Sequence, residues 1–256
     1  MGIFARLSVP WPAGVENMLS FFGVFHFNGA DVGKACFFGY SPSLLYTFEF
    51  LPVLIVLALI FIFHFASKIV MPMLKKDPWN HNKSMNTAGT FMQVVFIMLC
   101  GSVVRPIQCY TNPNATKSNT SFAQVLCWHG GDHMVMLAFA APVLFLVVAP
   151  FMAINVWAAF VLPAKTIEKG GKAGSVVRFR YLVYRFRPDA WWWGVVFSMR
   201  QLLIAFAATV QPDDPRAQII YLVAILTFYL AAVGRTWPWR SRELNLLDVV
   251  SITFFV

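Results

Sequence analysis

The chain has 256 residues, of which 59% are hydrophobic and only 12% are charged. That balance excludes an ordinary soluble globular domain. A helix needs about 20 mostly apolar residues to cross a hydrocarbon core of ~30 Å, and several stretches of the chain approach or exceed that length. The composition therefore predicts an all-α fold, a polytopic transmembrane helix bundle.

The net charge of +9 is unevenly distributed. Fourteen of the 20 Lys and Arg residues lie in or beside three connections between apolar stretches, near 71–86, 163–190 and 235–245. Nucleic-acid binding would require aromatic platforms or a basic recognition helix outside the membrane, and neither is visible in the sequence. The charge is therefore expected to serve the membrane rather than a nucleic acid.

The first 45 residues are expected to form an extracytoplasmic segment, with a short amphipathic helix at 15–27 lying in the membrane interface. Residues 46–256 are expected to form the transmembrane bundle. It should contain about six spans, near 48–70, 87–104, 134–162, 192–210, 218–234 and 246–256. The last stretch has eleven apolar residues, roughly half of what a bilayer core requires. We therefore expect the chain to be a fragment that stops within a helix.

The three basic connections alternate with the others, so the positive-inside rule predicts that they lie in the cytoplasm. The N-terminal segment is then extracellular, and the protein is expected in the plasma membrane. Basic connections of this kind interact with anionic lipids of the inner leaflet. The residues expected to face these lipids are Lys75, Lys76, Arg178, Arg180, Arg185 and Arg187.

The outer connection 105–133 contains Cys109 and Cys127, which are expected to form a disulfide on the oxidising side of the membrane. Cys36 is the odd cysteine on that side, and it is free, paired outside this sequence, or a competitor for that bond. Two N-glycosylation patterns, at Asn114 and Asn119, fall in the same connection. Their position agrees with the orientation that the charges predict.

Within the spans, Arg200 stands out because a charge near the middle of a bilayer is costly and is usually paired or functional. The functional interpretation is a gating or permeation charge. A single arginine does not make a voltage sensor, so the favoured interpretation is a structural ion pair or hydrogen bonds to carbonyls at a kink. Glu49 and Asp248 are the candidate partners, although neither lies at a matching depth.

No metal, cofactor or catalytic site is expected. Cys127, His129, Asp132 and His133 lie close together in the sequence, but the glycines at 130 and 131 disfavour the helix that would bring both histidines to one face. A phosphate-binding loop, a zinc-protease motif, a nucleophile elbow and a dinucleotide fingerprint are all absent from the sequence. The chain is therefore not expected to be an enzyme.

Three groups of residues resemble a known family. The first is Val9-Pro10-Trp11-Pro12, followed by an amphipathic segment and the lone Cys36. The second is Cys109 with Cys127-Trp128 and His133. The third is Arg187-Pro188, the tryptophans at 191–193 and Arg200, followed by Pro238-Trp239-Arg240 and Asn245-Leu246-Leu247-Asp248. Together they resemble the multi-helix membrane region of large eukaryotic, especially protist, surface proteins that is similar to transient receptor potential (TRP) channels. The resemblance implies membrane residence and a role as a channel or sensor.

The leading hypothesis is a TRP-like cation channel or sensory module, with cations and anionic lipids as partners and homo-oligomers as a further expectation. The alternative is a non-conducting membrane anchor or receptor module of a large surface protein. A transporter would predict internal repeats, and the sequence contains none. Against the channel, the connection between the fifth and sixth spans is short and basic and has no selectivity element.

Overall fold

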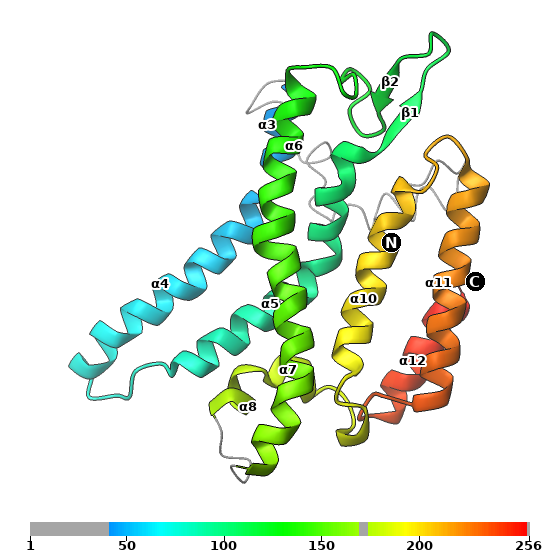
Figure 1. Cartoon of the computed structure of the whole chain (residues 1–256). Helices are drawn as coiled ribbons and strands as arrows, with labels where there is room; N and C mark the ends of the chain where they lie inside the picture. The colour runs from blue at the N-terminus through cyan, green and yellow to red at the C-terminus, as the bar shows by residue number, and fades with distance from the viewer. Residues whose placement is uncertain (1–40, 169–173, 255–256) are drawn as a thin grey trace. The chain divides into compact units, whose positions relative to one another are not determined.

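The computed structural model describes residues 41–168 and 174–254, and the regular structure of these residues is almost entirely helical (Figure 1). The amphipathic helix expected at 15–27, and with it Cys36, lies outside the described residues, as do Lys169 and Lys172.

The elements follow the apolar stretches of the sequence. The α-helices are α3 (Pro42–Thr47), α4 (Leu51–Met73), α5 (His81–Val104), α6 (Asp132–Val143), α7 (Ala149–Glu168), α8 (Gly174–Arg178), α9 (Arg180–Val183), α10 (Trp193–Phe206), α11 (Pro215–Thr236) and α12 (Arg242–Thr253). Short 3-10 helices are η3 (Arg105–Ile107), η5 (Pro188–Ala190) and η6 (Ala207–Thr209), and η4 (Leu144–Val148) is π-helical. Strands β1 (Cys109–Thr111) and β2 (Lys117–Asn119) form an antiparallel hairpin.

Four helical stretches are long and apolar enough to cross a membrane: Pro42–Met73, His81–Ile107, Asp132–Pro163 and Pro215–Thr236. Trp193–Thr209 is a shorter apolar helix, and α12 occupies the position of the last expected span. The expected all-α, polytopic membrane fold is confirmed.

Prolines set several features of these helices. Pro215 is the first residue of α11, where its missing N–H would have no partner within the helix in any case. Pro142 and Pro150 lie on either side of η4. In a regular α-helix the residue at position 150 would donate to the carbonyl of Leu146, which lies in η4, and Pro150 has no N–H to do so.

The chain divides into two compact units, and each is described separately. The first contains residues up to Leu51 together with Ile97–Ala149 and Arg200–Phe228, and the second contains Pro52–Phe96, Pro150–Met199 and Tyr229–Val256. In the first unit α3 lies beside α6 (Figure 1). Tyr46 of α3 is fully buried, and its hydroxyl donates a hydrogen bond of 3.1 Å to the carbonyl of Ser102.

A buried ion pair between Glu49 and Arg105 lies in the first unit, with both side chains at most 7% exposed. The Ser102 hydroxyl donates to the second carboxylate oxygen of Glu49 at 3.0 Å. The carbonyl of Arg105 accepts from the side-chain amide of Asn119 at 2.9 Å, which attaches the β-hairpin to the end of α5. Glu49, proposed from the sequence as a partner of Arg200, therefore binds Arg105 instead.

Removing one member of this pair should destabilise the fold, because it leaves the other charge buried without a partner. We expect Glu49→Gln to lower the free energy of unfolding by about 3 kcal/mol. The double variant Glu49→Leu with Arg105→Met should lose clearly less free energy of unfolding than the two single variants lose together. Thermal unfolding in detergent measures both effects, with the exposed Arg216→Gln as a control that should not change stability. Additive losses would show that the two charges are independent.

Candidate functional site

Cys109 and Cys127 form a disulfide in the structure, with Cα atoms 6.3 Å apart. His133 lies beside them, and the ligand atoms of these three residues are within 4.8 Å of one another. However, the two sulfurs are bonded to each other. One ring nitrogen of His133 accepts from the Trp128 N–H at 3.3 Å, and the other is 3.0 Å from the Pro106 carbonyl. The residues do not fit a metal ion, and the cluster is a structural one.

The two glycosylation patterns are in very different surroundings. Asn114 is exposed, and its side-chain oxygen accepts from the Thr116 hydroxyl at 2.6 Å, within its own sequence pattern. Asn119 is fully buried, and its amide donates to Arg105 while its oxygen accepts from the backbone N–H groups of Ser121 and Phe122. The sequence treats the two sites alike, but in the folded chain only Asn114 presents a free surface.

The acidic turn between α10 and α11 binds the β-hairpin through Asp213. Asp213 accepts from both the backbone N–H of Thr111, at 2.7 Å, and its hydroxyl, at 2.9 Å. These hydrogen bonds, the backbone one foremost, lower the pKa of Asp213. The connection between α10 and α11 is thereby attached to strand β1 of the same unit.

In the second unit, the basic connection after α7 is held in place through Tyr181. Its backbone N–H donates to Asn86 at 2.8 Å and its hydroxyl donates to Asn155 at 2.7 Å. Burial raises the pKa of Tyr181, so the hydroxyl remains a neutral donor. The ring packs so closely on Gly89 of α5 that a Cβ there would collide with it. Residues 178–187 are therefore part of the packed bundle rather than a loose loop.

Two basic connections that are far apart in the sequence meet in what we call the clasp, defined as residues 184–187 and 237–240. Phe186 and Trp239 form an antiparallel β-bridge. On either side of it, the Arg187 N–H donates to the Pro238 carbonyl at 2.8 Å and the Arg240 N–H donates to the Arg185 carbonyl at 3.2 Å. The clasp thus ties the entrance of α10 to the turn between α11 and α12.

Trp239 is the centre of the clasp. Its ring lies 4.9 Å from that of Phe186 and 5.8 Å, edge to face, from that of Phe197. Its indole N–H donates to Asp248 at 2.9 Å, and the same carboxylate oxygen accepts from the Tyr229 hydroxyl at 3.0 Å. This tryptophan therefore connects α10, α11 and α12.

Asn245 reinforces this geometry in the first turn of α12. Its oxygen accepts from the Trp239 N–H, and its amide donates to the carbonyls of Trp239 and Ser241. Arg240 donates to the Phe186 carbonyl and lies over the ring of Tyr184, which Arg180 also contacts. The motifs Pro238-Trp239-Arg240 and Asn245-Leu246-Leu247-Asp248 thus belong to one contact network.

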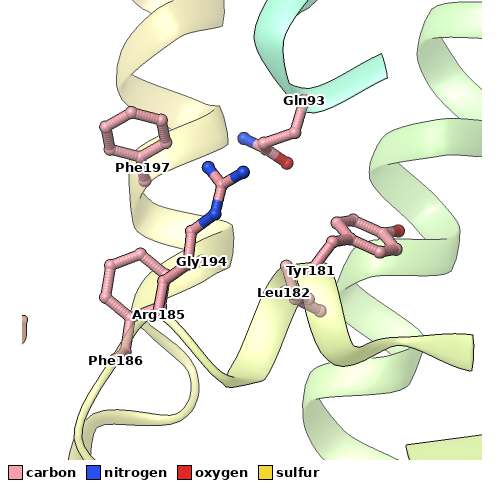
Figure 2. Close-up of a pocket in the computed structure, with 7 residues that line it drawn as sticks. All are labelled: Gln93, Tyr181, Leu182, Arg185, Phe186, Gly194 and Phe197. Atoms are coloured by element: carbon pink, nitrogen blue, oxygen red, sulfur yellow. The ribbon is translucent and has the colours of Figure 1, made fainter. Parts of the chain in front are cut away.

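A small pocket lies beside the clasp in the same unit (Figure 2). Its free space, including the part open to solvent, is about 180 Å³, and it is lined by Gln93, Tyr181, Leu182, Arg185, Phe186, Gly194 and Phe197. Gln93 is buried, and its amide donates to the Ser198 hydroxyl at 2.9 Å, which in turn donates to the Gly194 carbonyl. Figure 2 shows the guanidinium of Arg185 pointing toward the Gln93 amide.

The basic residues expected to face lipid differ from one another in exposure and in contacts. Lys75 and Lys76 are exposed in the turn after α4. Arg178 donates to Asn82, and Arg187 pairs with Asp189 at 2.9 Å on the surface. Arg180 is exposed and stacks on Tyr184, and Arg185 is half-buried at the pocket. Arg200 is half-buried in α10.

The tryptophan cluster before α10 is divided between the surface and the core. A run of three tryptophans, as at residues 191–193, is typical of an aromatic belt at a membrane interface. Trp192 is exposed, but Trp193 is fully buried and packs 5.7 Å from the ring of Tyr229. Trp193 is therefore a core residue, a distinction that a run of identical side chains in the sequence cannot reveal.

Sequence reasoning missed Gln93, Ser198 and Tyr181. The signal was available for the first two, because each is a polar residue within an apolar helix, where it needs a partner. That they contact each other, 105 positions apart, required the fold.

The long apolar helices, with their few buried polar contacts, define a polytopic helical membrane protein. A family model described as "Transient receptor potential (TRP) ion channel" matches residues 37–256, and the chain belongs to that family. No curated protein and no solved structure matches the chain.

Because Asn114 is exposed and Asn119 is buried, we predict one glycan, attached to Asn114. In a glycosylating host, Asn114→Gln should abolish the glycosidase-sensitive mobility shift, and Asn119→Gln should leave it unchanged. A shift that persists in Asn114→Gln and disappears in Asn119→Gln would contradict this assignment. The absence of any shift in the wild type would contradict the outer placement of the hairpin.

The stability of the clasp should depend on Trp239 and not on its neighbour Trp237. We expect Trp239→Leu to lower the free energy of unfolding by about 2 kcal/mol, because it removes two ring contacts and the hydrogen bond to Asp248. Trypsin should then cleave faster at the arginines of 178–187. Trp237 is 37% exposed, so Trp237→Leu is the matched control and should leave the cleavage rate unchanged. Equal acceleration by both variants would argue against the clasp.

Proposed function

We propose that the chain is the transmembrane region of a TRP-like cation channel in which the clasp couples the basic connection 174–190 to α12. Membership of the family supports the channel, and the family's function is ion conduction rather than catalysis. The clasp supports the coupling, because it joins the entrances of two helices through backbone hydrogen bonds and one shared tryptophan.

The clasp is suited to transmitting movement. A shift of residues 184–187 changes the position of Trp239, and Trp239 is hydrogen-bonded to Asp248 in the middle of α12. Contiguous packing of this kind has a small number of discrete arrangements rather than a continuous range. A stimulus acting on the basic connection is thus passed to α12 without any ligand contacting that helix.

The proposal includes the orientation derived from the charges. The basic connections face the cytoplasm and the anionic inner leaflet, the segment 1–45 and the disulfide-bonded hairpin are extracellular, and residues 46–256 form the membrane region of a plasma-membrane protein. Homo-oligomers are included as well, because the described connection between α11 and α12, residues 237–241, is too short to hold a selectivity loop. The ion path then runs between copies rather than through this connection.

Cation flux through the purified full-length protein in liposomes is the direct test. We expect flux under lipid, stretch or voltage stimuli, and a reduction of about tenfold in Trp239→Leu, with Trp237→Leu unchanged. The tenfold figure corresponds to about 1.4 kcal/mol of lost coupling between the clasp and α12. Wild-type protein that passes no current under any of these stimuli would favour the alternative, a non-conducting membrane anchor or receptor module.

A further inference from the structure

Two histidines from different helices lie edge to face in the second unit. His64 is in α4 and His81 is the first residue of α5, and their ring centres are 5.5 Å apart with the ring planes at 60°. Two imidazoles that share one zinc ion in tetrahedral geometry, through nitrogens at about 2.0–2.1 Å, have ring centres about 5 Å apart. The observed separation is therefore close to that of a pair of metal ligands.

The ring of His64 is held in the way that a metal ligand requires. The residue is 3% exposed, and its Nδ1 lies 2.9 Å from the hydroxyl of Ser84, a buried residue of α5. Metal-binding histidines use one ring nitrogen for the ion and hydrogen-bond the other, which fixes the ring. When Nδ1–H donates to the Ser84 hydroxyl, the lone pair of Nε2 is available to an ion. Nε2 is not among the enclosed, unpaired polar atoms of the described residues, so an ion can reach it.

His81 is the adjustable member of the pair. It is exposed, and no hydrogen bond within the described residues holds its ring, so either ring nitrogen can turn toward an ion beside His64. The connection before His81 is positioned by the Trp79 N–H, which donates to the hydroxyl of Ser67 in α4 at 3.1 Å. Lys68, four positions after His64, is exposed on the same face of α4, and its positive charge limits the affinity for a cation.

We propose that His64 and His81 bind one divalent transition-metal ion of the class of Zn²⁺ and that the ion bridges α4 to the start of α5. Imidazole nitrogens suit Zn²⁺, Cu²⁺ and Ni²⁺, whereas Mg²⁺ and Ca²⁺ prefer oxygen ligands. Two protein ligands leave the remaining positions of the ion to water, so the ion binds reversibly. The sequence does not indicate this pair, because histidines on separate helices have no metal-binding spacing.

A bound ion would add a link between α4 and α5 across the connection 74–80. Lys75 and Lys76 in this connection are exposed, and they are sites at which trypsin cleaves. Cleavage requires the connection to open locally, and a ligand that binds only the closed form makes such opening rarer. Zinc should therefore protect these two lysines from trypsin. None of this depends on whether the protein conducts ions.

The test titrates Zn²⁺ into the full-length protein in detergent, after removal of metals with a chelator and in the presence of excess Mg²⁺. We expect the wild type to bind Zn²⁺ and His81→Gln to raise the dissociation constant at least about tenfold, because one of two protein ligands is lost. Ser84→Ala keeps both ligands and should raise it about tenfold through the lost hydrogen bond to His64. His129→Gln is the matched control, since it removes another exposed histidine, and it should bind like the wild type.

Unchanged binding in His81→Gln, or an equal loss in His129→Gln, would overturn the site. A wild type that binds no Zn²⁺ under these conditions would overturn it as well. Cu²⁺ provides a second readout, because its electron paramagnetic resonance spectrum reports the imidazoles bound to it. Two coupled imidazoles are expected in the wild type and one in His81→Gln, whereas one in both proteins would contradict the bridge.

Zn²⁺ should slow tryptic cleavage at Lys75 and Lys76 in the wild type and not in His81→Gln, a comparison that also shows that the ion does not inhibit trypsin itself. Equal cleavage of the wild type with and without Zn²⁺ would overturn the bridge. Thermal unfolding in detergent without metal shows whether His81→Gln folds, as its exposure leads us to expect. If it does not fold, Ser84→Ala and the Cu²⁺ spectrum of the wild type decide the question.

Discussion

A polar group buried among apolar helices must find a partner, and this constraint determines most of what is specific in the described structure. In hydrocarbon an unsatisfied donor or acceptor costs several kcal/mol, so the few polar side chains within the helices decide which helices meet. Gln93 and Ser198 bring α5 and α10 together, and Tyr181 and Asn155 attach α9 to α7. Apolar contacts alone would specify these pairings weakly, because lipid tails satisfy an apolar face equally well.

The same constraint organises the clasp. Asp248 and Asn245 are polar residues of α12, and both bind Trp239 through hydrogen bonds. A turn of a few residues between α11 and α12 thereby acquires a defined geometry and is joined to the entrance of α10. In the proposed channel this is the element that converts events at a basic, lipid-facing connection into movement of a helix.

The class of fold was predictable because hydropathy and the alternation of charge are properties of local sequence. The pairing of Cys109 with Cys127, present in the structure, follows from their common position in one outer connection. Other properties were not predictable. Asn114 and Asn119 carry equivalent patterns, yet only the second is buried, and Trp192 and Trp193 are identical neighbours of which only the second is in the core. Burial depends on which surface another segment covers, and no local pattern encodes that.

By itself, the sequence determined that the chain is a helical membrane protein with alternating basic connections. It did so because the length, hydropathy and charge of each segment act locally against the bilayer. Only the tertiary structure decided that Glu49 binds Arg105, that the motifs at 187 and 238–248 form one clasp, and that Arg185 differs from the arginines around it. Each of these depends on contacts between residues distant in the sequence, and such contacts arise from packing rather than from composition.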